Sequence, residues 1–160
     1  MDPELCRQHL AELLAGEIAL LGQLEQLLEE ERELIGSAQP EDLRRTTRAR
    51  QERLGALARI EEQRRSLCSL HGEASDRAGL ERLRRWCDPA GTLTGALTEC
   101  LTLALRCRDL NDRNGLMVAA KMKRVSERLQ LLTGSVPRAE TYGPRGYSVH
   151  ARGGRMLGAV

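Results

Sequence analysis

The chain has 160 residues, of which 41% are hydrophobic, 30% charged and only 2% aromatic, and its formal net charge is +2. This length suffices for one domain with a modest core, and the scarcity of aromatic residues disfavours a β-sandwich or barrel, which fills its strands with β-branched and aromatic side chains. The acidic N-terminus and the lack of a long apolar run predict neither a secretion signal nor a membrane-spanning helix, so we expect a cytoplasmic protein.

The first predicted helix covers about residues 4–35. Leucine and isoleucine recur in it every seven residues, at Leu14, Leu21, Leu28 and Ile35, and further leucines widen this repeat into a broad apolar stripe. A stripe of this width is typical of a helix that packs against two partners. Gly36 and Pro40 then predict a stop and the start of the next helix.

The second predicted helix covers residues 40–70 and is rich in arginine. Residues 1–36 carry a net charge of −7, whereas residues 37–71 carry +3, so we expect these two helices to attract each other as they pack. The connection that follows contains one short amphipathic piece at about residues 80–87. We expect Trp86 to anchor this short helix on the bundle.

The last and longest predicted helix covers about residues 92–132. With 3.6 residues per turn, one line along it collects Leu93, Leu97, Cys100, Ala104, Cys107, Asn111, Val118, Met122, Val125, Leu129 and Leu132. Because no other helix is as long, part of this line should lack a cover within the chain. An uncovered apolar line is a candidate surface for a partner helix.

Together these elements predict an all-α fold: an elongated antiparallel bundle of three long helices plus one short connecting helix, over residues 1–134. Residues 135–160 contain two prolines and five glycines without apolar periodicity, and we expect them to form a flexible basic tail.

The sequence offers no arrangement typical of catalysis or cofactor binding. Its five cysteines, Cys6, Cys68, Cys87, Cys100 and Cys107, are odd in number and form no C-x-x-C pair. We expect reduced, buried thiols that bind no metal. No nucleophile–histidine–acid set and no phosphate-binding loop is recognisable, which disfavours an enzyme and predicts no cofactor.

Asn111 stands out because the predicted apolar line places a polar amide at its centre, with Asn114 at the edge of the same face. An asparagine inside a bundle needs hydrogen-bond partners, since an unpaired buried amide costs roughly 1–3 kcal/mol. Asn111 is therefore either a residue that sets the register of the helices, as in coiled coils, or a polar anchor for a bound segment. Spacing alone leaves both interpretations open.

Four short motifs resemble the FlgN family of flagellar export chaperones when they are taken together and in order. They are IEEQRR at residues 60–65, LNDRNG at 110–115, TYGPRG at 141–146 and HARGGR at 150–155. The second is similar to that family's L-N-x-x-N-G signature, and the last two resemble its tail elements. The pair Pro144–Arg145 departs from the small and acidic residues common there, which makes this tail more basic.

The resemblance implies a non-enzymatic chaperone. Such proteins bind the C-terminal regions of hook-associated junction proteins, prevent their premature association and deliver them to the cytoplasmic domain of the export gate. We therefore expect partner binding at Asn111, Asn114, Gly115, Val118, Met122, Val125 and Leu129, and docking to the gate at Tyr142, Gly143 and Gly146.

Two other functions remain open from the residues themselves. The heptad spacing of the first helix also suits a structural coiled-coil adaptor, and a homodimer of the free protein is compatible with it. The arginines of the second helix and the RGGR run would suit RNA, but the near absence of aromatic stacking platforms disfavours nucleic-acid binding.

Overall fold

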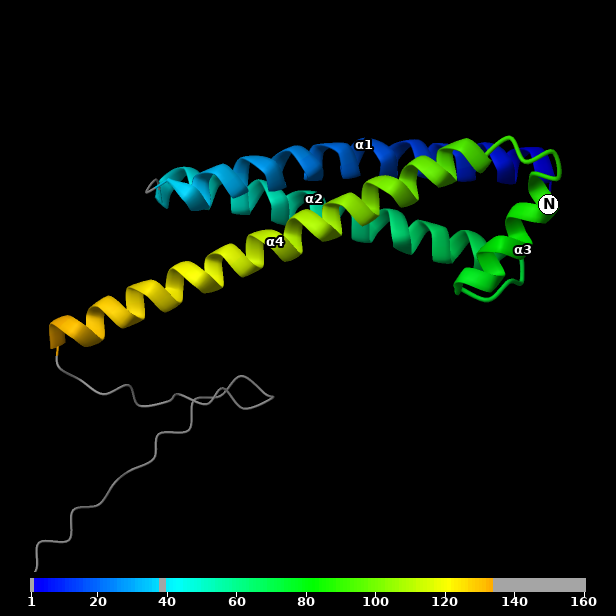
Figure 1. Cartoon of the computed structure of the whole chain (residues 1–160). Helices are drawn as coiled ribbons and strands as arrows, with labels where there is room; N and C mark the ends of the chain where they lie inside the picture. The colour runs from blue at the N-terminus through cyan, green and yellow to red at the C-terminus, as the bar shows by residue number, and fades with distance from the viewer. Residues whose placement is uncertain (1, 38–39, 134–160) are drawn as a thin grey trace, which may run out of the picture. The chain divides into compact units, whose positions relative to one another are not determined.

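A computed structural model describes residues 2–37 and 40–133, and these residues form four helices and no strand. The helices are α1 (Pro3–Gly36), α2 (Pro40–Leu70), α3 (Arg77–Cys87) and α4 (Thr94–Thr133), as Figure 1 shows. The predicted all-α fold with three long helices and one short connecting helix is confirmed. None of the described helices combines the length and the hydropathy needed to cross a membrane.

The chain divides into two compact units, residues 1–120 and 121–160. The packing of helices described below is that of the first unit. The predicted gate-docking residues, Tyr142, Gly143 and Gly146, lie outside the described residues.

Helix α1 supplies most of the buried apolar side chains of the first unit. The seven-residue repeat predicted from the sequence is confirmed, because Leu14, Leu21, Leu28 and Ile35 are all buried. The helix begins sharply, since the side chain of Asp2 accepts a hydrogen bond from the Glu4 backbone N–H at 3.0 Å and Pro3 occupies the first position. Helix α1 is thus the element on which the other helices pack.

Helix α2 runs antiparallel to α1. Two ion pairs set this direction: Glu17 pairs with Arg64 at 2.9 Å, and Glu31 pairs with Arg50 at 3.0 Å. From Glu17 to Glu31 the residue number rises along α1, whereas from Arg64 to Arg50 it falls along α2. Both pairs join an acid of α1 to an arginine of α2, as the opposite charges of the two segments predicted.

Helix α3 is held by Leu83 rather than by Trp86. Leu83 is 1% exposed, whereas Trp86 is 45% exposed and its ring lies against that of His71, with centroids 5.0 Å apart. The prediction that Trp86 anchors the short helix is therefore wrong. The buried line of α3 passes through Gly79, Leu83 and Cys87, which are smaller side chains four residues apart.

Asp88 fixes the point at which the chain turns into α4. Its carboxylate accepts hydrogen bonds from the backbone N–H groups of Leu93 and Thr92 at 2.9 and 2.8 Å, and from the Thr92 hydroxyl at 2.7 Å. These bonds lower the pKa of Asp88 below its ordinary value, and the bond from Leu93 has the largest effect. Gly91 has a φ of 71°, which a residue with a side chain rarely adopts, and so permits the tight turn.

Candidate partner-binding site

Within the first unit, α4 packs along α1 in the same direction. Two hydrogen bonds fix the register: the Cys107 thiol donates to the Leu21 carbonyl at 3.4 Å, and the Asn114 side-chain amide donates to the Leu28 carbonyl at 2.8 Å. Both bonds join residues 86 positions apart, and they lie seven residues from one another on each helix. A constant offset over one heptad is the packing of a parallel coiled coil.

The α4 residues buried in this contact recur every seven positions. They are Leu93, just before the helix, and Cys100, Cys107 and Asn114, and we call this set the buried repeat. The predicted placement of the two asparagines is wrong, because Asn111 is exposed and Asn114 is 3% exposed. The reason is the period: a heptad repeat departs from a straight helix by about 20° per heptad, or about 60° over three heptads.

Asn114 belongs to a group of polar side chains that joins three helices. Its amide also lies 3.3 Å from a carboxylate oxygen of Glu31, which pairs with Arg50. Arg50 in turn reaches the side-chain oxygen of Asn111 at 3.4 Å. We call Glu31, Arg50, Asn111 and Asn114 the polar cluster; it ties α4 to both α1 and α2.

Glu31 and Arg50 are the members of this cluster that the sequence did not identify, and the burial of Glu31 is the less expected of the two. Glu29, Glu30 and Glu31 resemble a solvated charge run, yet Glu31 is only 5% exposed. Its position seven residues after the buried Leu24 was the available signal. Removing one partner of a buried ion pair strands the other charge at a cost of roughly 3–5 kcal/mol, so Arg50 and Glu31 depend on each other.

The apolar pattern of α4 changes register after Asn114. The next two positions of the buried repeat are Lys121 and Arg128, which are charged and exposed. Large apolar side chains occur instead at Val118, Met122, Val125 and Leu129, which we call the exposed run, and they are between 44% and 65% exposed. Their spacing of three and four residues places them on one apolar face of α4.

Gly115 lies between the buried repeat and the exposed run. A methyl group built on its backbone would meet no atom within 4 Å, so nothing in the described chain requires a glycine there. A glycine inside a helix costs roughly 0.5–1 kcal/mol relative to alanine. Its presence leaves an open strip of backbone beside the exposed run, where another chain could approach closely.

The cysteines have no features of a reactive site. All five are free and buried, as predicted. Burial raises the pKa of the Cys6, Cys68 and Cys107 thiols and raises that of Cys100 to about 11. These four thiols are protonated at neutral pH and are not activated nucleophiles. Among the described residues, no group of three histidine, cysteine or acidic side chains could hold a metal ion.

These features define an all-helical protein with a packed helical core and an exposed apolar helix face. A family model described as FlgN protein matches residues 1–149. The chain therefore belongs to the FlgN family, a family of flagellar chaperones, as the motifs predicted. Comparisons with curated proteins and with solved structures give no match.

The polar cluster predicts that the two asparagines contribute differently to stability. Asn114→Ala should lower the free energy of unfolding by roughly 1–3 kcal/mol, because it removes the amide donor that faces the buried Glu31 carboxylate. Asn111→Ala should change it by less than about 0.5 kcal/mol, since Asn111 is exposed. Urea denaturation of both variants measures the difference, and equal losses would contradict the assignment of Asn114 as the buried member.

Proposed function

We propose that this protein is a cytoplasmic, non-enzymatic chaperone that binds the C-terminal segments of hook-associated junction proteins. It prevents their premature association and delivers them to the cytoplasmic domain of the flagellar export gate. Membership of the FlgN family supports the chaperone class. The single observation that supports the binding site is the exposed run on α4.

The exposed run has the chemistry that an amphipathic client segment needs. Its four side chains follow one another at intervals of four, three and four residues, which is the spacing of anchors in helix-in-groove recognition. They are aliphatic or methionine, and such flexible side chains can repack around more than one client. Covering them would remove apolar surface from water, which is the main favourable term in association.

The signature residues have different parts in this proposal. Asn111 and Gly115 are exposed and lie just before the exposed run, where they can contact the client. Asn114 is buried against α1, so we assign it the role of holding α4 in register instead of touching the client.

Delivery to the gate is assigned to Tyr142, Gly143 and Gly146, on the basis of the TYGPRG motif. An aromatic side chain is a frequent anchor in protein interfaces, because it buries a large area at a low entropy cost. The proposal therefore separates client binding on α4 from gate docking in the tail.

Client binding should be lost when a charge is placed on the exposed run. Met122→Glu should weaken the affinity for a junction-protein C-terminal peptide by about a hundredfold, since it puts an unpaired carboxylate in an apolar contact. Leu131→Glu is the matched control, because Leu131 is 86% exposed and lies outside the run. Titration calorimetry measures both affinities, and equal effects would argue against this face as the client site.

Gly115→Ala tests close approach of the client to the backbone. In the free protein it should raise the stability by roughly 0.5–1 kcal/mol, because the added methyl group meets open space. The client affinity should fall at the same time. Gly22→Ala, another helical glycine with open space around it, should be stabilising without any loss of affinity. Unchanged client affinity in Gly115→Ala would remove this residue from the site.

Tyr142→Ala should separate the two functions. We expect its affinity for the client peptide to stay within about twofold of the parent, and its binding to the purified cytoplasmic domain of the gate to fall by about tenfold or more. Surface plasmon resonance with each ligand measures both. A loss of client affinity would contradict the proposed division between α4 and the tail.

A further inference from the structure

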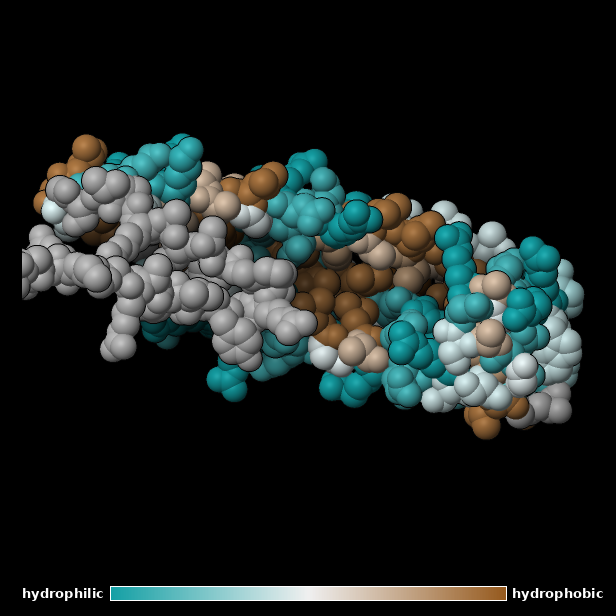
Figure 2. Space-filling view, turned by 90° about the horizontal axis from the view of Figure 1, so that it is seen from below, coloured by the Kyte–Doolittle hydropathy of each residue, from teal (hydrophilic) through white to brown (hydrophobic). Residues whose placement is uncertain are grey.

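A second apolar surface lies in the first unit, away from the exposed run. A groove of about 610 Å³ is lined by residues of all four helices. Its apolar wall consists of Leu10, Leu13 and Leu14 of α1, Leu80 of α3, and Leu97 and Leu101 of α4. Figure 2 shows hydrophobic side chains gathered in a recess with hydrophilic side chains on both sides.

The groove exists because α2 and α4 both pack on α1. One end of the groove is bounded by α3. Leu10 and Leu14 are fully buried at its base, whereas Leu101 is 58% exposed at its edge. An edge leucine with this exposure leaves apolar area that a further helix would cover. A fourth long helix seated there would complete a four-helix arrangement around α1.

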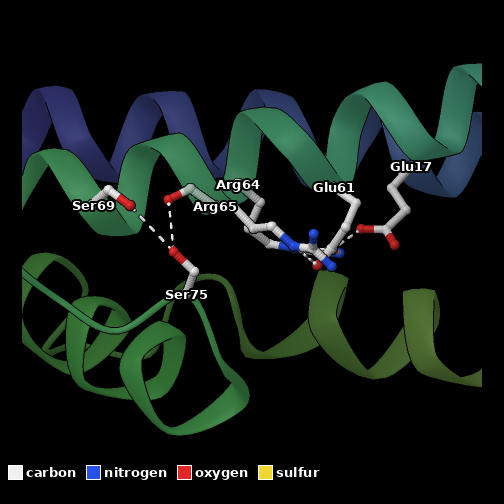
Figure 3. A network of polar contacts seen from close by, with 6 residues as sticks. All are labelled: Glu17, Glu61, Arg64, Arg65, Ser69 and Ser75. Carbon is white, nitrogen blue, oxygen red and sulfur yellow. Dashed lines mark hydrogen bonds and ion pairs between the residues drawn. The ribbon is translucent and has the colours of Figure 1, made fainter.

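The rim of the groove carries three arginines and two glutamates. Arg64 is already engaged, since it pairs with Glu17 of α1 at 2.9 Å and with Glu61 of its own helix, as Figure 3 shows. Arg84 pairs with Glu81 at 2.8 Å. Arg77, by contrast, makes no hydrogen bond or ion pair with any described residue, so the rim has one uncompensated positive charge.

We propose that this groove binds an acidic amphipathic helix of a partner protein, with leucine-type anchors on the apolar wall and a carboxylate paired with Arg77. Charge decides among the possible occupants. Residues 134–160 of the chain itself carry four arginines and one glutamate, so their net charge matches that of the rim. A second copy would offer its exposed run, where Lys121 and Arg128 place positive charge beside the apolar side chains, so its charge also matches that of the rim.

This inference concerns a surface distinct from the exposed run and does not rest on the proposed client. The probe is a synthetic helical peptide of about 18 residues with leucines at i, i+3, i+4 and i+7 and glutamates on its polar face. The matched peptide carries lysine in place of every glutamate. We expect the full chain to bind the glutamate peptide about tenfold more tightly than the lysine peptide, as measured by fluorescence anisotropy.

Two variants locate the binding. Leu101→Glu should lower the affinity for the glutamate peptide by about tenfold or more. Arg77→Glu should reverse the preference between the two peptides. Both positions are exposed, so neither change should unfold the chain. Leu70→Glu, a 66% exposed leucine outside the groove, should leave peptide binding unchanged.

Three results would overturn the proposal. The first is binding that Leu101→Glu leaves intact, and the second is equal affinity for the glutamate and lysine peptides. The third is a dimer in light scattering that Leu101→Glu dissociates, which would assign the groove to a second copy. Because Met122→Glu tests the client site separately, failure of one assignment is distinguishable from failure of the other.

Discussion

The register between α1 and α4 is the constraint on which the rest of the first unit depends. It is fixed where the Asn114 amide donates to the Leu28 carbonyl, seven residues beyond the Cys107–Leu21 bond. A slip of one heptad would keep the leucines in contact but would place Asn114 opposite Ile35, away from Glu31. The apolar contacts alone do not distinguish these registers, whereas a buried amide without its carboxylate partner is costly.

The long helices were predictable because their apolar periodicity and their glycine and proline boundaries act locally. The buried repeat of α1 was predicted correctly for the same reason. The placement of Asn111 and Asn114 was predicted wrongly. A line drawn with 3.6 residues per turn describes an isolated straight helix, whereas the buried residues of the packed helix recur every seven positions. The burial of Glu31 could not be read from its acidic neighbours, because it depends on Arg50, nineteen residues along the chain. Trp86 shows the same limit: its size suggested an anchor, but the packing of α3 selected Leu83.

The polar cluster also determines which part of α4 is available to other proteins. Up to Asn114 the buried repeat is used inside the chain, and its seven-residue continuation would fall on Lys121 and Arg128. Two charged side chains cannot extend an apolar contact without a desolvation cost, so the internal use of the repeat ends there. The apolar residues that follow begin four positions after Asn114, outside the buried repeat, and they are exposed. The same helix therefore serves a folded core and an open face, with Gly115 between them.

The two open surfaces differ in a way that bears on specificity. The exposed run is a narrow line on a single helix, where alternation with Lys121 and Arg128 places positive charge beside the apolar anchors. The groove has walls from four helices, and most of its rim charges are already paired within the chain. A flexible line tolerates many amphipathic sequences, while a walled groove with one free arginine selects for shape and for the position of a carboxylate. The groove would discriminate among partner helices through the unpaired Arg77, because a helix without a carboxylate in reach of Arg77 would bury that charge without compensation.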